Sequence, residues 1–208
     1  MVYAPLGPTH TAVEDFSLML SVPNMKVFAP ADAFEMENLL QASVDDKDPY
    51  YIRFGKGGES VVTEQFEDFD FKPKFFGGDK SEVAIFTTGI MLQHCLGAKE
   101  LLAGKGISIT VVHFPYLNDL SLAHIASLVG SASLLLSAEE HVPRGGLFTQ
   151  LLHEFFNARI STENLNQLSL PSAFSHNYGS QSDHLDFNGL TAPKIAARIE
   201  ALLITNGK

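Results

Sequence analysis

The chain has 208 residues, 45% of them hydrophobic and 18% charged, which is enough to bury a substantial core in one large domain or two small ones. Its formal net charge is -10, and lysine and arginine form no cluster that could follow a row of phosphates, so the composition argues against binding to nucleic acid or to an anionic membrane surface. No apolar run approaches the roughly 20 residues of a membrane-spanning helix, so we expect no membrane partner.

A single cysteine, Cys95, limits the thiol chemistry of the chain. One thiol makes neither an internal disulfide nor a metal site of several cysteines, and a reducing environment is the expectation. The first residues also lack the basic start and apolar core of an export signal. We therefore expect a cytoplasmic protein.

The first third of the sequence alternates helical and strand patterns. Residues 14–23 have the apolar spacing of a short helix, and residues 25–30 have the pattern of a buried strand. Residues 32–46 follow as an amphipathic helix that begins at Asp32, and residues 49–56 supply another strand. Such alternation is typical of a parallel sheet.

A polar and aromatic stretch that ends in two glycines, residues 64–80, is the best candidate for a linker. After it the alternation restarts. The predicted strands lie at 82–89, 107–115 and 132–141, and the predicted helices lie at 90–106, 122–131, 145–156 and 192–203.

These patterns predict an α/β protein of two unequal parts. Residues 77–208 have the elements of a complete small α/β domain with three layers, whereas residues 1–76, which include the linker, offer about two convincing strands. A parallel sheet needs both faces covered and its central strands paired on both sides. The first part is therefore expected to be a partial parallel sheet, resembling the second half of a domain.

His10 is the first candidate for chemistry. Pro8 and Thr9 restrict the backbone ahead of it, and Thr9 or Thr11 is expected to cap the following helix, so the imidazole would lie at a helix start where an anion or polar substrate is favoured. A lone histidine is more often a surface or capping residue than a catalytic one. The pattern alone leaves both interpretations open.

Arg53 and Lys56 are the second candidates, because they follow a predicted strand at the end where open α/β sheets bind ligands. The glycines at 57 and 58 would let the backbone approach an anionic group. The alternative is a basic strand end that leads into a flexible loop. No phosphate-loop motif supports the first interpretation.

Glu139, Glu140 and His141 form the third group, at the end of a predicted strand and before two glycines. Carboxylates beside a histidine are potential metal ligands. Consecutive residues of a strand point to opposite faces, however, so these three do not converge without a partner segment and a structural role is favoured. Packing is also the default interpretation for His94, Cys95, His113 and His124.

Several motifs in order along the chain resemble one enzyme family. The segment "LGPTHTAVEDFSLMLSVPNMKVFAPADAFEMENLLQAS" has a Gly-Pro-Thr-His motif, a helix, "PN" with a strand and "PAD" with a helix, and it is similar to the thiamine diphosphate-dependent transketolases, including the deoxyxylulose-phosphate synthases. The "VAIFTTG" strand, the "EEH" and "GGL" turn, and the later "LP", "GSQ" and "NGL" segment resemble the C-terminal domain of the same enzymes. The resemblance covers essentially the whole chain.

The resemblance implies that residues 1–76 are the second half of a pyrimidine-binding domain and that residues 77–208 are a transketolase C-terminal domain. In the family, a separate N-terminal domain binds the diphosphate and Mg²⁺, and the glutamate that activates the cofactor lies in the first half of the pyrimidine-binding domain. Neither has a counterpart in this sequence. Thiamine diphosphate and Mg²⁺ are therefore expected in the complete enzyme and not on this chain alone.

The resemblance also assigns roles to two residues. His10 falls on the family histidine that contacts the donor substrate beside the reactive carbon of the cofactor, where it donates to a developing oxyanion or helps to move a proton. Lys56 falls where the family commonly has an arginine that binds a sugar phosphate, and lysine keeps the charge without the bidentate fork. Leu6 departs from the pattern, because sugar-using members carry an aspartate there that binds a donor hydroxyl.

The hypothesis that follows is a C-terminal part of a transketolase-like enzyme, which transfers a two-carbon ketol unit from a ketose-type donor to an aldehyde acceptor. The isolated chain is expected to be inactive and to form a homodimer, with an N-terminal transketolase subunit as a further possible partner. Two alternatives stay open. One is part of the β subunit of a 2-oxo acid dehydrogenase, and the other is a non-catalytic assembly module.

Overall fold

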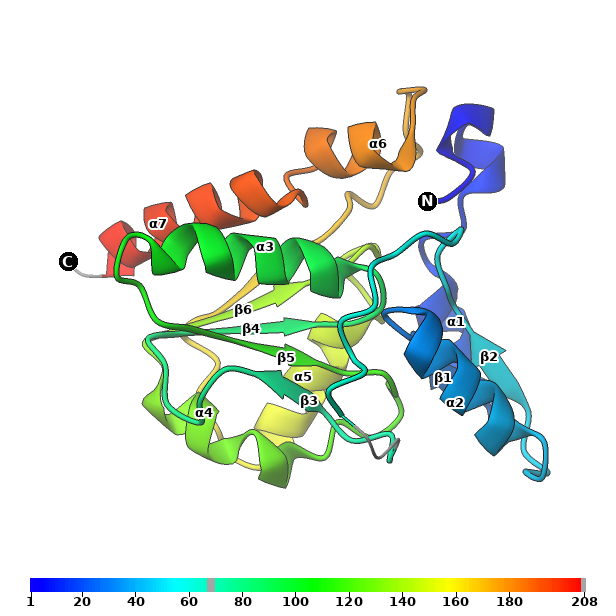
Figure 1. Cartoon of the computed structure of the whole chain (residues 1–208), viewed down its shortest axis with the longest axis horizontal. Coiled ribbons are helices and arrows are strands. Elements are labelled where there is room, and N and C mark those ends of the chain that lie inside the picture. The colour runs from blue at the N-terminus through cyan, green and yellow to red at the C-terminus, as the bar shows by residue number, and fades with distance from the viewer. Residues whose placement is uncertain (67–69, 207–208) are drawn as a thin grey trace.

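Strand pairing in the computed structural model, which describes residues 1–66 and 70–206, separates two parts of the chain (Figure 1). Among these residues, one sheet has two strands and the other has five, in the order β3-β5-β4-β6-β7. The strands are β1 (Lys26–Phe28), β2 (Tyr50–Ile52), β3 (Lys74–Phe76), β4 (Val83–Thr87), β5 (Ile109–His113), β6 (Leu134–Ala138) and β7 (Leu165–Leu168).

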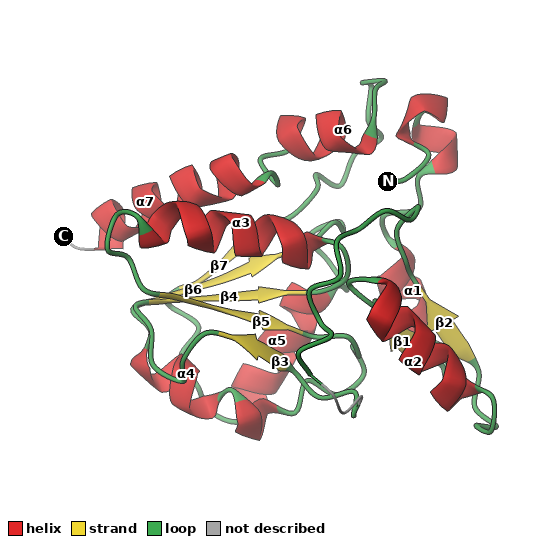
Figure 2. Cartoon of the chain, in the orientation of Figure 1, coloured by secondary structure: helices red, strands yellow, loops and turns green. Residues whose placement is uncertain are grey.

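Helices connect and cover these strands (Figure 2). The α-helices are α1 (Asp15–Leu20), α2 (Ala33–Ser43), α3 (Met91–Ala103), α4 (Ala126–Ser131), α5 (Leu147–Asn157), α6 (Gln181–Phe187) and α7 (Ala192–Asn206). Three short 3-10 helices within the described residues are η1 (Ala4–Leu6), η2 (Pro8–His10) and η3 (Leu122–His124). Within residues 1–66 and 70–206, no helix has both the length and the apolar character needed to cross a membrane.

The five-stranded sheet is the middle layer of three. α3 and α7 cover one face of this sheet, and α4 and α5 lie on the other (Figure 1). β4 pairs in parallel with both β5 and β6, β7 pairs in parallel with β6, and β3 is antiparallel to β5. Every residue of β4, β5 and β6 is buried, as expected for parallel strands with helices on both sides. The predicted α/β class with a three-layer second part is confirmed.

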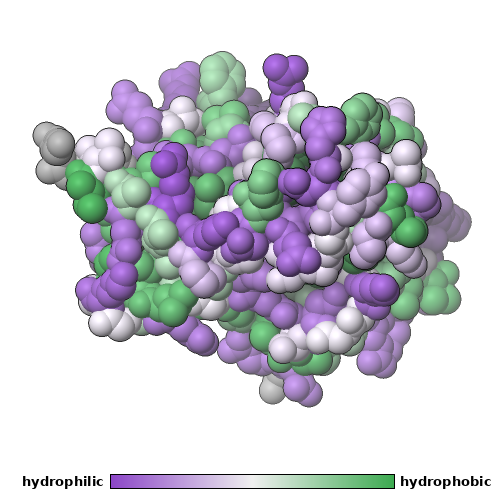
Figure 3. Space-filling view, turned by 90° about the horizontal axis from the view of Figure 1, so that it is seen from above, coloured by the Kyte–Doolittle hydropathy of each residue, from purple (hydrophilic) through white to green (hydrophobic). Residues whose placement is uncertain are grey.

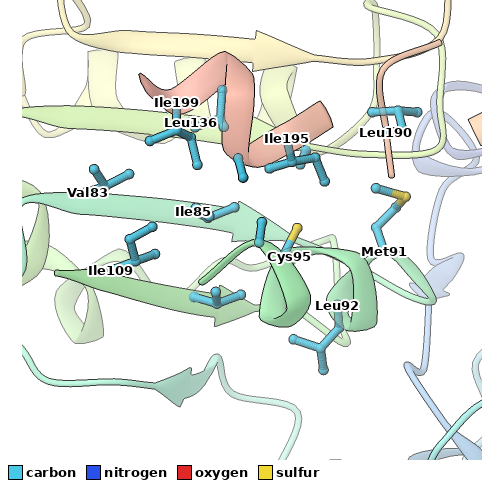
Figure 4. Packing of buried hydrophobic residues seen from close by; sticks show 14 of the residues in the cluster. Val83, Ile85, Met91, Leu92, Cys95, Ile109, Leu136, Leu190, Ile195 and Ile199 are labelled. Atoms are coloured by element: carbon cyan, nitrogen blue, oxygen red, sulfur yellow. The ribbon is translucent and has the colours of Figure 1, made fainter. Parts of the chain in front are cut away.

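Successive residues of β4 point into two different cores. Val83 and Ile85 face α3 and α7, where Figure 4 shows them among apolar side chains of both helices. Ala84 and Phe86 face α5 on the opposite side. The surface above α3 and α7 is mixed, with hydrophobic residues scattered among hydrophilic ones (Figure 3). The helices therefore bury one face against the sheet and leave the other to solvent.

The two-stranded sheet docks on the larger part through β1. β1 pairs in parallel with β2, and its other edge is bonded to the segment that follows β5, because the Ala29 N–H donates to the Pro115 carbonyl (2.9 Å) and the Leu117 N–H donates to the Val27 carbonyl (3.0 Å). Val27, Ala29 and Phe16 are buried in the same core as Phe86. The first part thus completes a core of the second.

Asp32 begins α2, as the sequence predicts. Its Oδ1 accepts from the Glu35 N–H (3.1 Å) and from the Thr63 hydroxyl (2.7 Å), and its Oδ2 accepts from the Val62 and Thr63 N–H groups. Burial acts to raise the pKa of Asp32, but these donors outweigh it and hold the pKa below its ordinary value. One carboxylate therefore caps a helix and anchors the chain that leaves the first part.

Three elements differ from the sequence-based expectation. β3 lies inside the predicted linker at 64–80, part of which (67–69) is outside the described residues, and it belongs to the larger sheet although it precedes the predicted boundary after residue 76. β7 is an edge strand with only partial burial, so it lacks a strong apolar pattern. α6 begins with a capping box formed by Ser180 and Asp183, in a stretch for which no helix was predicted. The division into domains at residue 76 stays a prediction.

Two glycines in helices offer a matched test of this packing. A Cβ at Gly97 in α3 would lie 2.9 Å from the Cβ of Ala192 in α7, whereas a Cβ at Gly130 in α4 would meet no atom within 4 Å. We expect Gly97→Val to lower the free energy of unfolding by about 1–3 kcal/mol through overpacking. Gly130→Ala should raise it by up to about 1 kcal/mol through helix propensity.

Urea unfolding of the two variants and the parent chain measures both effects. Equal stability of Gly97→Val and the parent would mean that α3 and α7 can separate without cost, contrary to the close approach described here.

Candidate functional site

A cleft of about 170 Å³ lies where the first part meets the carboxyl ends of the larger sheet. Its walls include Arg53 just after β2, Thr88 just after β4 and Glu140 shortly after β6. The segment before α1 contributes His10, and the first residue of α1 is Asp15, which also lines the cleft. The carboxyl ends of parallel strands are where α/β proteins bind ligands, so this cleft is the candidate functional site.

His10 is an exposed wall residue of the cleft, at the end of η2. The turn requires glycine at position 7 for two reasons. Gly7 has a φ of +80°, and a Cβ at this position would lie 2.9 Å from the Tyr178 ring. The expectation that Thr9 or Thr11 caps the next helix is wrong. The Thr9 Oγ1 lies 3.0 Å from His10 Nδ1, the Thr11 hydroxyl donates to the Pro8 carbonyl, and α1 starts five residues after His10 without a side-chain cap.

Lys56 lies just beyond the cleft wall. The neighbouring Gly55 lines the cleft, while the exposed Lys56 places its Nζ 5.6 Å from the centre of the Tyr3 ring. Gly57 and Gly58, with φ of +100° and +92°, have open space around them, as the predicted loop requires. The side chain is therefore held loosely at the mouth of the site by a cation–π contact.

Arg53 joins two buried carboxylates inside the cleft. Its Nη1 lies 3.5 Å from Asp15 Oδ1, and its Nη2 lies 3.3 Å from Glu140 Oε2 and donates to the Glu140 carbonyl oxygen. Tyr51 donates its hydroxyl to Asp15 Oδ2 (2.7 Å), and Gln181 donates its amide to Glu140 Oε1 (2.8 Å). Side chains from β2, α1, α6 and the end of β6 thus form one polar cluster.

Electrostatics favour the charged form of Glu140 and the neutral form of Tyr51. Burial acts to raise the pKa of Glu140, but the positive charges of Arg53 and of the Met1 amino group, 2.7 Å from Oε1, outweigh it and hold the pKa below its ordinary value. Burial and the nearby Asp15 raise the pKa of Tyr51, so its hydroxyl remains a donor. The Phe16 ring packs beneath the guanidinium at 4.6 Å, which adds a cation–π contact.

Glu139 has a different role from its neighbour Glu140. Its carboxylate accepts from the N–H groups of Leu147 (2.8 Å) and Phe148 (3.1 Å), at the N-terminus of α5. A Cβ at Gly146 would lie 2.1 Å from Glu139 Oε2, so the second glycine of the turn makes room for the carboxylate. Glu139 therefore caps a helix, in agreement with the structural role favoured from the sequence.

His113 and Cys95 are buried, His94 is partly buried and His124 is exposed. His113 is fully buried, with Nε2 2.8 Å from Glu35 Oε2, which ties β5 to α2. Burial lowers the pKa of His94 and raises the pKa of the Cys95 thiol to about 12. His124 is exposed, with Nδ1 3.3 Å from the Ser121 carbonyl oxygen. Within residues 1–66 and 70–206, no group of three or more His, Cys, Asp or Glu side chains is arranged to hold a metal ion.

The structure brings together one set of residues that the sequence had separated. Arg53 was a candidate because it follows a strand, and Glu140 was a candidate because it ends one, and the two meet in the cleft. Asp15, Tyr51 and Gln181 were missed, because nothing in the local pattern marks them. The position of Arg53 and Glu140 after parallel strands was the available signal.

A wider, mainly apolar groove of about 640 Å³ adjoins the cleft. Met1 and Thr11 line both. Leu170, Phe174 and Phe187 contribute apolar surface to the groove, and the two phenylalanines are largely exposed. The cleft therefore opens beside a hydrophobic surface.

Comparison with known proteins matches both parts of the chain. Residues 1–58 match the family model described as transketolase, pyrimidine binding domain, and residues 78–195 match the model described as transketolase, C-terminal domain. Among curated relatives, 1-deoxy-D-xylulose-5-phosphate synthase of Dictyoglomus thermophilum is 30% identical over 199 residues, covering 95% of this chain and 32% of the relative. A putative uncharacterized transketolase family protein of Sinorhizobium fredii is 29% identical, covering 95% of this chain and 57% of the relative.

Solved structures share the same arrangement. A split gene transketolase, described as an inactive beta4 tetramer, has a TM-score of 0.83 and 26% identity, covering 95% of this chain and 64% of that one. Transketolase from Campylobacter jejuni has a TM-score of 0.75 and 18% identity, covering 96% of this chain and 29% of that one, which supports the fold alone. The chain spans about a third of the length of the synthases that it matches.

Glu139 provides a pH-dependent test of the helix cap. Burial raises the pKa of Glu139 to about 7, against the opposing effect of its N–H donors, so between about pH 4.5 and pH 7 the folded state binds more protons than the unfolded state. The contribution of Glu139 to stability is therefore greatest in acid and is lost as pH rises to about 7. Relative to Glu139→Gln, we expect the parent chain to lose roughly 2–4 kcal/mol between pH 4.5 and pH 8.

Urea unfolding of the parent and Glu139→Gln across this pH range gives the difference between their free energies of unfolding. Titratable groups that both proteins share contribute equally and cancel in this difference. Parallel stability curves for the parent and Glu139→Gln would contradict a raised pKa at this position.

Proposed function

This chain belongs to the thiamine diphosphate-dependent transketolase family, as a C-terminal portion of such an enzyme, and we propose that it is the substrate-contacting subunit of a split transketolase-type enzyme. The observation that carries the proposal is the place of His10. The family motif that contains it forms one wall of a cleft at the carboxyl ends of β2, β4 and β6. In the complete enzyme the reaction is transfer of a two-carbon ketol unit from a ketose-type donor to an aldehyde acceptor.

A separate subunit would supply the diphosphate and Mg²⁺ site. The split gene transketolase, which is similar over 95% of this chain and 64% of its own length, supports an enzyme divided between separate chains. We propose the same partnership here, with self-association into a homodimer or larger assembly when the partner is missing.

We propose that the described residues form only part of the cofactor site. The cleft of about 170 Å³ is smaller than the roughly 300–1,000 Å³ of typical ligand pockets, and its two carboxylates, Asp15 and Glu140, are engaged by Arg53. When bound in the assembled enzyme, thiamine diphosphate supplies the carbon centre that carries the two-carbon unit. This chain would contribute one wall of that site.

His10 has the chemistry that this wall requires. When the Thr9 hydroxyl donates to His10 Nδ1, the neutral imidazole carries its proton on Nε2, which makes Nε2 a hydrogen-bond donor. We propose that Nε2 donates to the substrate oxygen that gains negative charge during transfer. The open position of the ring at the cleft wall leaves this nitrogen available to a substrate.

Lys56 and Leu6 would adjust which substrate is accepted. The exposed ammonium of Lys56, beside the cleft wall, suits the phosphate of a sugar phosphate but as a point charge without a fork. Leu6 is 55% exposed on η1 and offers no hydrogen bond where sugar-using members have a carboxylate. We propose a donor with fewer recognised hydroxyls than a typical ketose.

A non-catalytic assembly role is the second candidate, and the inactive tetramer of the split gene neighbour favours it for the chain without a partner. The expectation of a 2-oxo acid dehydrogenase β subunit has no comparable support among the relatives described above. The two candidates differ in whether cofactor binding appears when the partner is added.

Titration calorimetry with thiamine diphosphate and Mg²⁺ separates these possibilities. We expect no binding to the isolated chain and binding to its mixture with the diphosphate-binding subunit from the same source. In that mixture His10→Ala should lower ketol transfer by about 10²–10⁴-fold, because a positioned acid or base contributes that much. His153→Ala, which changes an exposed histidine on α5, is the control and should keep full activity.

Absence of cofactor binding in the mixture would favour the assembly role. Full activity of the His10→Ala mixture would remove His10 from the site.

Lys56 has its own test. Lys56→Ala should raise KM for a phosphorylated substrate about tenfold or more, and Lys56→Arg should lower it, because arginine restores bidentate phosphate contacts. Lys47→Ala, at an exposed position after α2, is the matched control. Equal KM values for all three variants would mean that the phosphate is bound elsewhere.

A further inference from the structure

Two buried carboxylates share the charge of Arg53 at the seam between the two parts of the chain. Asp15 and Glu140 are each 6% exposed, and they come from α1 and from the loop after β6. Two carboxylates that are shielded from solvent repel each other, and their burial without a cation is unfavourable. The guanidinium pairs with both carboxylates, and the Met1 amino group adds a second positive charge 2.7 Å from Glu140 Oε1.

Asp15 connects this cluster to His10. It is the first residue of α1, only five residues after His10, and its second oxygen is held by Tyr51. The intervening loop also contacts the larger part, because the Val142 N–H donates to the Val13 carbonyl (3.0 Å) and Val13 packs against the core beneath α3 and α7. Movement of Asp15 would therefore move the loop that carries the imidazole.

Glu140 supplies the fixed side of the cluster. It follows β6, whose residues are all buried, and Gln181 at the start of α6 holds its Oε1. Arg53 donates to its backbone carbonyl as well as pairing with its carboxylate. The guanidinium is thus anchored to the rigid sheet by one partner and holds the His10 loop by the other.

We propose that Arg53 is a positioning residue for His10, whose guanidinium bridge from Glu140 to Asp15 fixes the His10 loop against the carboxyl end of β6. The inference rests on the proposed function in one respect, that His10 is the residue that meets the substrate. Arg53 itself is occupied by the protein's own carboxylates, which differs from the ligand-binding role considered from the sequence.

The geometry requires arginine at this position. The two carboxylates lie on different nitrogens, Asp15 at Nη1 and Glu140 at Nη2, so a planar fork serves both at once. The Phe16 ring beneath the guanidinium holds the plane in place. A lysine ammonium could pair with one carboxylate and would leave the bridge half formed.

Two substitutions in the full chain separate bridging from packing. Arg53→Met keeps an apolar stem of similar length and removes the charge, and Arg53→Lys keeps the charge and removes the fork. The readouts are amide hydrogen exchange of residues 11–16 and the imidazole carbon–proton NMR signal of His10, assigned from His10→Ala. Lys26→Met is the control, because Lys26 pairs with Asp46 and Asp48 rather than with a residue of the cleft wall.

We expect Arg53→Met to speed exchange at residues 11–16 at least tenfold and to shift the His10 signal, while exchange in β4 stays as in the parent. Arg53→Lys should fall between the two, and Lys26→Met should match the parent at both readouts. A role in packing alone predicts the reverse order, with Met closer to the parent than Lys. That order, or a folded Arg53→Met with parent-like exchange and His10 signal, would overturn the proposal.

If Arg53→Met does not fold, Arg53→Lys decides the question, with at least threefold faster exchange at residues 11–16 expected and parent-like exchange contradicting the bridge. In the mixture with the diphosphate-binding subunit, Arg53→Lys should lower kcat at least tenfold and change KM less than threefold. A kcat equal to that of the parent would also overturn the proposal.

Absence of turnover in the mixture that contains the parent chain would count against the proposed function alone, since the exchange and NMR readouts need no activity.

Discussion

Burial of both faces of β4 is the constraint on which the rest of the structure depends. A parallel strand in the middle of a sheet has no face that solvent can reach, so Val83 and Ile85 need helices on one side and Ala84 and Phe86 need them on the other. α3 and α7 meet the first need. α5 meets the second only in part, and Phe16, Val27 and Ala29 of the first part complete that core. The same apolar burial that stabilises the larger sheet thus brings the two parts together.

The position of the cleft follows from this docking. When Val27 and Ala29 pack beside Phe86, the carboxyl end of β2 comes to the carboxyl ends of β4 and β6. Polar groups that end these strands are then buried at the seam and need partners. Arg53 between Asp15 and Glu140 meets that need in the cleft, and Glu35 with His113 meets it deeper in the seam. Stability and site geometry therefore rest on the same contacts.

The described residues also leave one strand edge and one apolar surface uncovered. The two-stranded sheet is bonded to the larger part along β1, and within the described residues no strand pairs with the outer edge of β2. The apolar groove next to the cleft is bordered by exposed phenylalanines at positions 174 and 187. Unpaired edges and exposed apolar surfaces are common at subunit contacts, which agrees with a family member that spans a third of its longer relatives.

Local pattern was sufficient for the features whose cause is local. The apolar runs of β4, β5 and β6 predicted buried strands, and Asp32 predicted the start of α2, because burial and capping depend on neighbours in sequence. The ordered set of motifs that includes Gly-Pro-Thr-His predicted the family. The short edge strands β3 and β7 were missed because edge strands are short and only partly apolar.

The interior of the site was decided by tertiary structure. Arg53 meets Asp15 across 38 residues of sequence and Glu140 across 87, and neither separation leaves a periodic signal. The prediction that Thr9 or Thr11 caps α1 was wrong for a related reason. The chain follows the cleft wall after His10, and α1 begins only at Asp15. The sequence by itself determined the family and the elements with strong local patterns. The burial of charges between distant segments determined which side chains meet, because electrostatic pairing in a water-excluded interface depends on distance in space.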